Sequence, residues 1–518
     1  MSIDIPVSIA ASTWREKSCR WLGLFIVALT TFVLVRIAVL NIFYTTGDMQ
    51  DPGWLATVTW HNDWRLHGPA AFPGLYFSEH VAPILWLTNA VSYLVPLAKF
   101  DYYAACIAAI HALYAAGVYR AWLLTEPRLT PARVIVAIVV ALAAAFSAVA
   151  IIALDLPHPE LAIPALALWF VIAMARRAYV AAACWLVACL AVREDAGLHV
   201  SALLIMWAGV LVIRRRGLSS DIRFLLSFAI LALSYSVLTF LAKHFYFPAS
   251  DILTRSYLGN PPLHHVTVPF ILHRLRFYLL ERTYVLLPLL ISLVWGAITR
   301  NPLLPLGYLA ALPWLLLSIV SVHPTPGTLG YYYGFPFWLS LAWPLVALRV
   351  WRDNDGRAGR RWPYALLLLV SLAGWQSNRL VIYPLVTNYL GESPFTYNET
   401  LRDREAYQKF VDYFLANRPL FGSVALDQAV FGLLIDHADR PDLLYLWPAG
   451  RQPGTIIYFP GAFDWRPNVL PLLRTGIYRC IYAVPGTRIR LATQNPLSDD
   501  LPRPVPLILV TNAPGTGC

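Results

Sequence analysis

Long apolar runs are the feature of this sequence that most restricts what it can fold into. Stretches of about 18 or more mainly apolar residues recur between Trp21 and Leu380, and each is long enough to cross the hydrocarbon core of a bilayer. Hydrophobic residues make up 58% of the chain and charged residues only 13%, which is not the balance of a soluble globular domain. The sequence therefore predicts an all-α polytopic membrane bundle.

Basic residues between the apolar runs predict the orientation of the chain. The formal charge of +11 is spread over short clusters at the ends of the runs, which is the positive-inside pattern, and we therefore exclude nucleic acid as a partner. Arg15, Lys17 and Arg20 hold the N-terminus in the cytoplasm. The first run, Trp21–Phe43, has full membrane length and lacks the small-residue cleavage site of a signal peptide.

The apolar run Val81–Leu97 differs from the others. Counted as a span, it would move the later arginine clusters to the outer side of the membrane. As a juxtamembrane helix lying partly in the outer leaflet, it leaves every cluster in the cytoplasm, and we expect this arrangement. The bundle then has about eleven transmembrane helices. After Trp21–Phe43, the expected spans are Tyr102–Leu124, Val134–Ala153, Leu161–Ala175, Tyr179–Val192, Gly197–Ile213, Phe224–Leu241, Tyr284–Ile298, Leu303–Val320, Phe335–Val350 and Tyr364–Leu380.

After Gly391, charged residues, prolines and short β-type runs replace the long apolar runs. We therefore divide the chain into a transmembrane domain, residues 1–390, and a small α/β domain, residues 391–518, which an odd number of spans places outside the cytoplasm. The first outer loop with its juxtamembrane helix covers residues 43–101. The outer domain is expected to contain an amphipathic helix at 402–417, strands at 423–427, 443–447 and 455–459, a helix at 428–437, and a hairpin turning at Pro485-Gly486. A disulfide between Cys480 and Cys518 is an option in an oxidising compartment.

Acids and histidines gather in the first outer loop, in the stretch 47–83. Asp48 and Asp51 open this stretch, and Glu79 and His80 stand near its end. Ionisable groups at membrane depth are costly and usually have a function, and a carboxylate beside apolar walls can act as a general base. The alternative is a hydrated connecting loop whose tryptophans lie at the interface.

Two further motifs fall on the same outer face. In His158-Pro159-Glu160 the proline fixes the backbone, so that two potential metal ligands can converge on one cation; the alternative is a helix start with proline in its first turn. Arg193-Glu194-Asp195 either binds substrate or forms an interfacial ion-pair cluster that caps the next helix. Arg276 offers a further cation, and Tyr331, Tyr332 and Tyr333 either stack on a sugar ring or belong to an interfacial belt.

Four pieces of the sequence carry a family resemblance: DPGWLATVTW with SEHVAPIL, LPHPELAIP, VREDAGL, and SVALDQAVFGLLIDHADRPDLLYLWP. An acid-led first outer loop, a juxtamembrane helix and an acidic motif after the third span resemble the GT-C glycosyltransferases, membrane enzymes that use polyprenyl-phosphate-linked sugars. The four pieces are most similar to an uncharacterised family of bacterial predicted membrane proteins related to these enzymes. The resemblance covers roughly residues 40 to 450.

The resemblance implies roles for individual residues. An aspartate of the first outer loop would act as base or position the acceptor, and Asp51 or Asp48 matches it. The acidic pair of the second outer loop, which binds a divalent cation (Mg or Mn) in some members, would fall on His158 and Glu160, with Asp155 nearby. This sequence has no plain Asp-x-Glu or Asp-Asp pair there, which argues against metal dependence. Independently of the resemblance, the charged motifs and the tyrosine run on the outer face predict a substrate-binding set of Glu79, His80, Arg193, Glu194, Asp195, Arg276 and Tyr333.

The resulting hypothesis is a GT-C glycosyltransferase of the bacterial cytoplasmic (inner) membrane. It would move a sugar from a polyprenyl-phosphate donor to a glycan, lipid or protein acceptor on the outer face, with membrane lipids around it. A transporter or lipid flippase is the first alternative, but such proteins place ionisable residues near mid-span, where only Arg36, His111 and Lys243 qualify. The second alternative is a non-catalytic envelope protein whose outer domain binds a partner.

Overall fold

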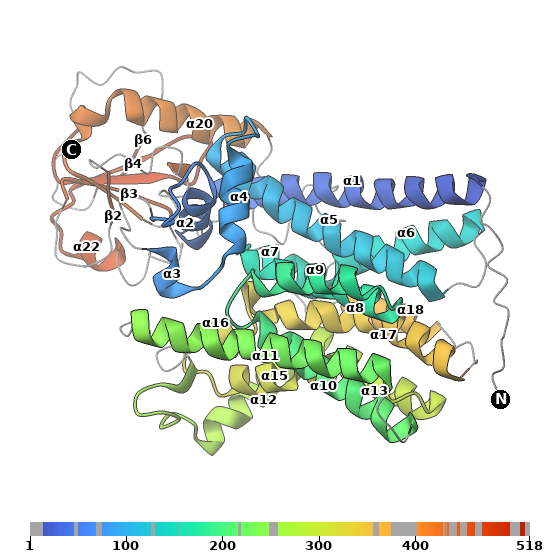
Figure 1. Cartoon of the computed structure of the whole chain (residues 1–518). Coiled ribbons are helices and arrows are strands. Elements are labelled where there is room, and N and C mark those ends of the chain that lie inside the picture. The colour runs from blue at the N-terminus through green and yellow to red at the C-terminus, as the bar shows by residue number, and fades with distance from the viewer. Residues whose placement is uncertain are drawn as a thin grey trace, which may run out of the picture.

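The computed structural model describes most of the chain. The described residues are 14–45, 50–68, 75–125, 130–154, 156–215, 219–247, 257–355, 362–373, 401–427, 430, 433–434, 443–445, 453–460, 469–497 and 508–512. Figure 1 shows a bundle of long helices with a small sheet domain at one end. Asp48, Asp155, Cys518 and the predicted domain boundary at residue 391 lie outside the described residues.

The apolar runs fold into helices, most of them close to the predicted bounds. Four described helices are long and apolar enough to cross a membrane, and up to six spans result if each of two bent helix pairs counts as one. The chain is therefore a multi-pass membrane protein, and the larger number of spans stays a prediction. The helices of the bundle are α1 (Trp14–Thr45), α5 (Lys99–Thr125), α6 (Pro131–Ala145), α7 (Ala148–Leu154), α8 (Ala162–Ala175), α9 (Tyr179–Leu190), α10 (Ala196–Arg215), α11 (Ser220–Tyr246), α12 (Val268–Glu281), α13 (Thr283–Thr299), α14 (Leu306–Ala310), α15 (Leu312–Ile319), α17 (Phe335–Asp355) and α18 (Trp362–Ala373).

Three predicted elements have a different form in the structure. The predicted span 134–153 is broken into α6 and α7, whose axes differ by 49°. The predicted span 303–320 is likewise divided, into α14 and α15. Residues 268–281, expected within a long outer loop, form the helix α12, which meets α13 at an angle of 80°. The side chain of Thr267 accepts a hydrogen bond from the backbone of Phe270, and Pro269 stands in the first turn, so this helix has a regular start.

The first outer loop contains three short helices, α2 (Gln50–Thr59), α3 (Tyr76–Glu79) and α4 (Ile84–Ser92). With nine residues, α4 is too short to cross a membrane, in agreement with the predicted juxtamembrane helix. Its first backbone N–H, that of Ile84, donates to the carbonyl oxygen of Ala191 at the end of α9 over 2.8 Å. Figure 1 shows these three helices at the end of the bundle that faces the sheet domain.

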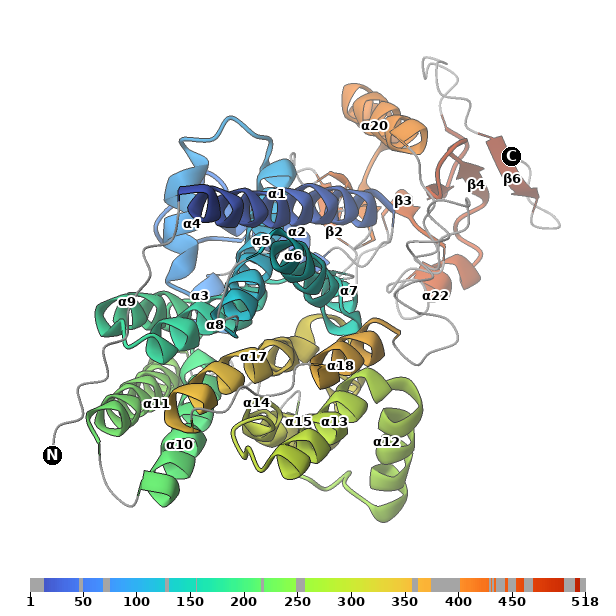
Figure 2. The same ribbon diagram turned by 90° about the vertical axis from the view of Figure 1, so that its right-hand side faces the viewer.

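Buried aromatic residues hold the centre of the bundle together. On α17, Trp338 and Trp343 are fully buried, and the ring of Trp338 stacks on Tyr114 of α5 with a centroid distance of 4.0 Å. The hydroxyl of Tyr114 also donates to the carbonyl oxygen of Trp338 over 2.7 Å. Figure 2 shows α1 lying against α5 and α6 on one side of the bundle, with α12 and α13 on the opposite side.

A close approach of α10 and α11 leads to a testable prediction. A β-carbon added to Gly197 would lie 1.9 Å from the backbone oxygen of Ala232, so an alanine at this position must push the helices apart. We expect Gly197→Ala to destabilise the protein by about 1–3 kcal/mol, as overpacking does elsewhere. Gly209 on the same helix has no atom within 4 Å of an added β-carbon, so Gly209→Ala is the matched control and should not destabilise. Thermal unfolding in detergent measures both variants, and equal melting temperatures would contradict the prediction.

The C-terminal domain has a six-stranded sheet with the order β2-β1-β3-β5-β4-β6. The strands β1 (Val424–Leu426), β2 (Leu443–Tyr445) and β3 (Thr455–Tyr458) are parallel, and β4 (Cys480–Ala483) and β5 (Arg490–Thr493) form the predicted antiparallel hairpin. The helix α20 (Leu401–Ala416) matches the predicted amphipathic helix, whereas the edge strand β6 (Ile508–Asn512) and the short helix α22 (Leu470–Arg474) were not predicted. Cys480 is disulfide-bonded.

Candidate functional site

A row of alternating charges lies buried at the end of the bundle that carries the first outer loop. The guanidinium of Arg193 donates to Glu160 through Nη1 over 2.7 Å, and its other nitrogens donate to both carboxylate oxygens of Asp195, with Nε to Oδ1 at 2.7 Å. Each of these three side chains is at most 10% exposed. The row continues to His199, whose Nε2 lies 3.6 Å from Asp195. Because every charge has an opposite neighbour, the cluster is compatible with burial.

His158 joins this row to the first outer loop. Its Nδ1 lies 3.2 Å from Oε2 of Glu160, and its Nε2 lies 3.7 Å from Oδ2 of Asp51. The side chain of His158 is 8% exposed, whereas that of Asp51 is 48% exposed. We expected the carboxylate of Asp48 or Asp51 within roughly 10 Å of His158 or Glu160, since a reaction site gathers its groups around one centre. For Asp51, the structure confirms this convergence.

Local sequence explains how the His158-Pro159-Glu160 motif presents its side chains. Pro159 opens a single 3-10 turn, η1 (Pro159–Leu161), directly before α8, and His158 precedes it in extended conformation. The helix-start interpretation of this motif is therefore correct, and it coexists with convergence of the two flanking side chains. The carbonyl of Pro157 accepts a hydrogen bond from Tyr103 of α5 over 2.6 Å, which fixes the turn.

The Arg193-Glu194-Asp195 motif connects α9 to α10 and forms the ion-pair cluster that was one of its two interpretations. Glu194 makes a second set of contacts. Its carboxylate accepts the backbone N–H of Val81 over 2.8 Å and lies 3.0 Å from Nδ1 of His80. Lys243 of α11 approaches the same carboxylate to 3.6 Å and donates to the backbone oxygen of Glu79. Glu194 thus attaches the end of the first outer loop to the helical bundle.

Aromatic rings form a second wall of the site. The short 3-10 turn η3 (Tyr331–Gly334) places Tyr332 face to face with the imidazole of His158, with centroids 3.9 Å apart and planes 14° apart. Tyr333 stacks on Tyr332 in turn, with a centroid distance of 4.4 Å. The guanidinium of Arg193 lies 5.5 Å from the ring centroid of Phe335. These contacts restrict the rotation of both cationic side chains.

Burial and pairing act against each other on the protonation of these groups. Burial raises the pKa of Glu160, but the cations of His158 and Arg193 outweigh it and hold that pKa well below its usual range. Burial likewise opposes the charged form of Asp195, yet Arg193 and His199 keep its pKa below its usual range. For His158, burial lowers the pKa, but the charges of Glu160 and Asp51 raise it to about 9. The imidazole is therefore a cation at neutral pH.

The charge state of His158 predicts how stability depends on pH. The folded-state pKa of about 9 lies above the ordinary value of 6.5, so the interactions of the cation contribute fully below about pH 6.5 and are lost as the pH rises through about 9. We expect the wild-type melting temperature to fall over this range relative to that of His158→Gln. Glu160 titrates far below this window and adds no slope to it. Parallel pH profiles of the two proteins would contradict the expectation.

Other predicted site residues lie apart from this cluster or contact it differently. Arg276 is exposed on α12, and none of the described hydrogen bonds or ion pairs joins it to the cluster. Glu79 contacts the cluster only through its backbone oxygen, which accepts a hydrogen bond from Lys243 in the described structure. Two cluster residues were not predicted as site residues: His199, which stands four positions after Asp195, and Lys243, the isolated lysine at the end of an apolar helix. Tyr332 belongs to the tyrosine run that was expected either to stack on a sugar ring or to lie in an interfacial belt. Lys243 carried a sequence signal, because a charge near the end of a span needs a partner.

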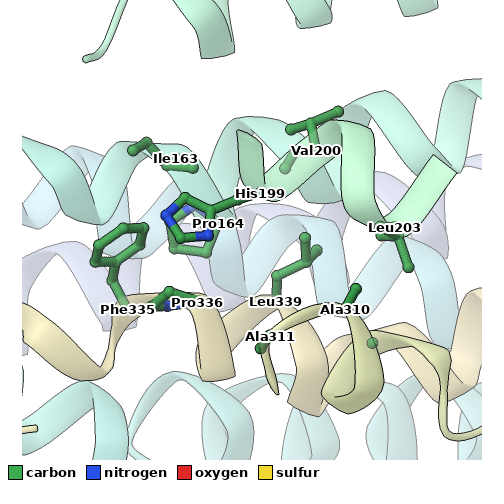
Figure 3. Close-up of a pocket in the computed structure, with 12 residues that line it drawn as sticks. Ile163, Pro164, His199, Val200, Leu203, Ala310, Ala311, Phe335, Pro336 and Leu339 are labelled. Carbon is green, nitrogen blue, oxygen red and sulfur yellow. The ribbon is translucent and has the colours of Figure 1, made fainter. Parts of the chain in front are cut away.

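A small cavity of about 20 Å³ lies beside His199, between α8, α10, α14 and α17. Figure 3 shows the imidazole of His199 beside the ring of Phe335, with aliphatic side chains of α10 and α17 also lining the cavity. His199 is the one ionisable residue among those that line the cavity. A space of this size holds at most a single water molecule, and it is not a substrate pocket.

A larger groove, with a volume of about 500 Å³, lies on the first outer loop. Its aromatic walls are Trp64, Trp86 and Tyr93, of which Trp64 is 71% exposed. The indole N–H of Trp86 donates to the carbonyl oxygen of Trp64 over 2.8 Å, and the amide of Asn89 bonds the backbone of Asn62 in both directions. The walls are therefore held in place, and Trp64, Trp86 and Tyr93 remain largely exposed although Arg65 lies over Trp64 and His61 stacks on Tyr93.

The arrangement of His158 and Glu160 does not fit a divalent cation. Both oxygens of Glu160 already have partners, since Oε1 accepts from Arg193 and Oε2 lies against His158. Within the part of the chain that the structure describes, no group of three histidine, cysteine or acidic residues could hold a metal ion. We therefore derive no chemical step through a metal.

No protein-family model and no curated protein sequence matches this chain. Its structural neighbours include two solved structures of ArnT from Cupriavidus metallidurans, one bound to undecaprenyl phosphate and one in the apo state. The identity is 13% in both comparisons, and the TM-scores are 0.44 and 0.40. The similarity covers 92% and 90% of this chain, respectively, and 98% of each ArnT chain.

Proposed function

We propose that this protein is a membrane glycosyltransferase that moves a sugar from a polyprenyl-phosphate donor to an acceptor on the outer face of the bacterial cytoplasmic membrane. The observation that carries the proposal is the contact between Asp51 and His158. It presents one accessible carboxylate, 48% exposed, beside one buried cation at the end of a membrane-embedded helical bundle. Both residues lie in the sequence pieces that resemble a bacterial membrane-protein family related to the GT-C enzymes.

This pair has the groups that sugar transfer from a phosphate requires. In the proposed step, Asp51 takes the proton of the acceptor hydroxyl, and the hydroxyl oxygen forms a bond to the anomeric carbon. The bond between that carbon and the phosphate oxygen breaks, and the phosphate leaves with the electron pair. Attack opposite the leaving group inverts the configuration at the anomeric carbon. The departing phosphate needs a cation more than it needs an acid.

The geometry narrows the choice of that cation. All three nitrogens of Arg193 are engaged by Glu160 and Asp195, so Arg193 supports the site without reaching a substrate. His158 faces Asp51 through Nε2, which has no hydrogen-bond partner. Lys243 borders the loop that ends at His80 and provides a second positive charge. The exposed rings of the groove at Trp64, Trp86 and Tyr93 provide faces on which a sugar can stack.

The charges inside the bundle favour this function over transport. Arg36 of α1 forms an ion pair with Asp101 at the start of α5, over 3.0 Å, and Lys243 pairs with Glu194. His111 of α5 packs against Trp338 and is fully buried. A transporter needs such groups along a substrate path, whereas here Arg36 and Lys243 are engaged in ion pairs, and Lys243 pairs with Glu194 beside the candidate site.

The decisive experiment is a transfer assay with purified protein in lipid vesicles. The vesicles contain a panel of polyprenyl-phosphate sugars, with membrane lipid extract or peptidoglycan precursors as acceptors, and mass spectrometry follows the release of polyprenyl phosphate. We expect release that depends on both protein and acceptor. Absence of release with every donor, from protein whose folding is verified by its melting transition, would contradict the proposal.

A further inference from the structure

The imidazole of His158 lies between the carboxylates of Asp51 and Glu160, at 3.7 Å and 3.2 Å. We propose that the side chain of His158 takes the place of a metal ion in this reaction centre, which therefore works without a divalent cation. This inference rests on the proposed glycosyl transfer and extends it by naming the group that contacts the departing phosphate.

The first argument concerns the ligands that a metal would need. Glu160 is 1% exposed in its side chain, and each of its oxygens has a cationic partner. A metal bound to Oε1 would have to displace Arg193, which also holds Asp195. Displacement would leave a buried guanidinium with one partner fewer, and separating such a buried pair is strongly unfavourable. Glu160 therefore has no free carboxylate oxygen with which to bind a metal ion.

The second argument concerns the charge on the imidazole. Two carboxylates face it, and the ring of Tyr332 stacks on it at 3.9 Å, where the electron-rich face of a tyrosine attracts a cation. The ordinary cost of burial is outweighed, and the pKa of His158 is raised to about 9 by Glu160 and Asp51. Two carboxylates and the face of an aromatic ring thus hold a positive charge on the imidazole of His158.

The third argument concerns the direction of the imidazole. Nδ1 is directed to Glu160, which orients the ring, while Nε2 is buried, has no hydrogen-bond partner, and faces Asp51. A buried donor without a partner costs free energy, and it persists where a ligand completes it. Nε2 is therefore the hydrogen-bond donor for the leaving phosphate oxygen, next to the carboxylate that deprotonates the acceptor.

The test combines a metal-binding measurement with an activity measurement. Purified protein is stripped with EDTA and titrated with Mn²⁺, and electron paramagnetic resonance reports the fraction of Mn²⁺ bound. In parallel, transfer is measured in EDTA and after addition of Mg²⁺ or Mn²⁺. We expect no stoichiometric Mn²⁺ binding by the wild type and less than a twofold change in its transfer rate across these conditions.

Two substitutions at position 158 sharpen the metal-binding result. His158→Asp exchanges the cation for a third carboxylate facing Asp51 and Glu160, and we expect it to acquire stoichiometric Mn²⁺ binding. His158→Gln keeps a polar side chain without the charge and serves as the control, with no binding and a transfer rate lowered by about 10²–10³-fold, as for loss of an oxyanion donor. Circular dichroism and melting curves establish that each variant is folded, and the wild-type measurements decide the inference even if a variant does not fold.

The outcomes separate this inference from the proposed function. Transfer by the wild type that is lost in EDTA and restored by Mg²⁺ or Mn²⁺ would refute the inference and support the glycosyltransferase. Stoichiometric Mn²⁺ binding that His158→Gln abolishes would also refute it. Absence of transfer under every metal condition would count against the proposed function alone, and the Mn²⁺ titration of the wild type would still decide whether the centre holds a metal.

Discussion

Asp51→Asn is expected to lower the rate of sugar transfer by about 10²–10⁴-fold, because an amide keeps the shape and hydrogen bonding of the carboxylate but cannot accept the acceptor proton. Stability should change little, since the side chain is 48% exposed and its one described ion pair, with His158, spans 3.7 Å. The transfer assay in vesicles measures the rate, and the melting temperature verifies the fold.

The matched control for Asp51 is Asp63 in the same outer loop. Its side chain is 47% exposed and pairs with a histidine as well, His67, at 2.7 Å. Asp63→Asn removes the same charge from the same loop, so a general effect of loop charge would lower both rates, whereas a catalytic role lowers only one. Asp48→Asn completes the series, because Asp48 lies outside the described residues and remains the second predicted base. Full activity in Asp51→Asn with loss in Asp48→Asn would move the role to Asp48.

Arg193→Met is expected to destabilise the protein by about 3–5 kcal/mol, because it leaves two buried carboxylates, those of Glu160 and Asp195, without their principal partner. The methionine fills much of the volume of the arginine, so the loss of stability reflects the missing charge more than a change in packing. Chemical or thermal unfolding in detergent measures the change.

Two further variants test whether the loss arises from buried charge. The triple variant Arg193→Met, Glu160→Gln, Asp195→Asn removes all three charges and should recover most of the stability, since neutral groups carry a smaller burial cost. Arg177→Met is the control: it breaks the pair with Asp221 at 3.0 Å, where the arginine side chain is 66% exposed, and should cost less than about 1 kcal/mol. Equal losses in Arg193→Met and Arg177→Met would show that the buried row does not hold the site together.

The positions of most helices, and part of the outer domain, could be predicted from the sequence. The helix α5, predicted as a span at 102–124, begins at Lys99 and ends at Thr125. The hairpin of β4 and β5 turns at Pro485-Gly486 as expected. Both features depend on local patterns, namely the length of an apolar run and the chemistry of a turn. The break between α6 and α7 was missed because the apolar run continues through it, so that composition does not mark the bend.

The motifs of the candidate site were also visible in the sequence, since acids, histidines and arginines are rare in such an apolar chain. The ion-pair partners of these side chains could not be predicted from the sequence, because an ion pair joins groups that are close in space at any separation along the chain. Glu160 and Arg193 are 33 positions apart, and His80 and Glu194 are 114 apart. The sequence by itself determined a multi-pass helical protein with charged motifs at the ends of its helices. Only the tertiary structure decided that Arg193 is engaged by two carboxylates, that Glu160 has no oxygen left for a metal, and that His158 faces Asp51, because these facts follow from how α5, α8, α10 and the first outer loop pack against one another.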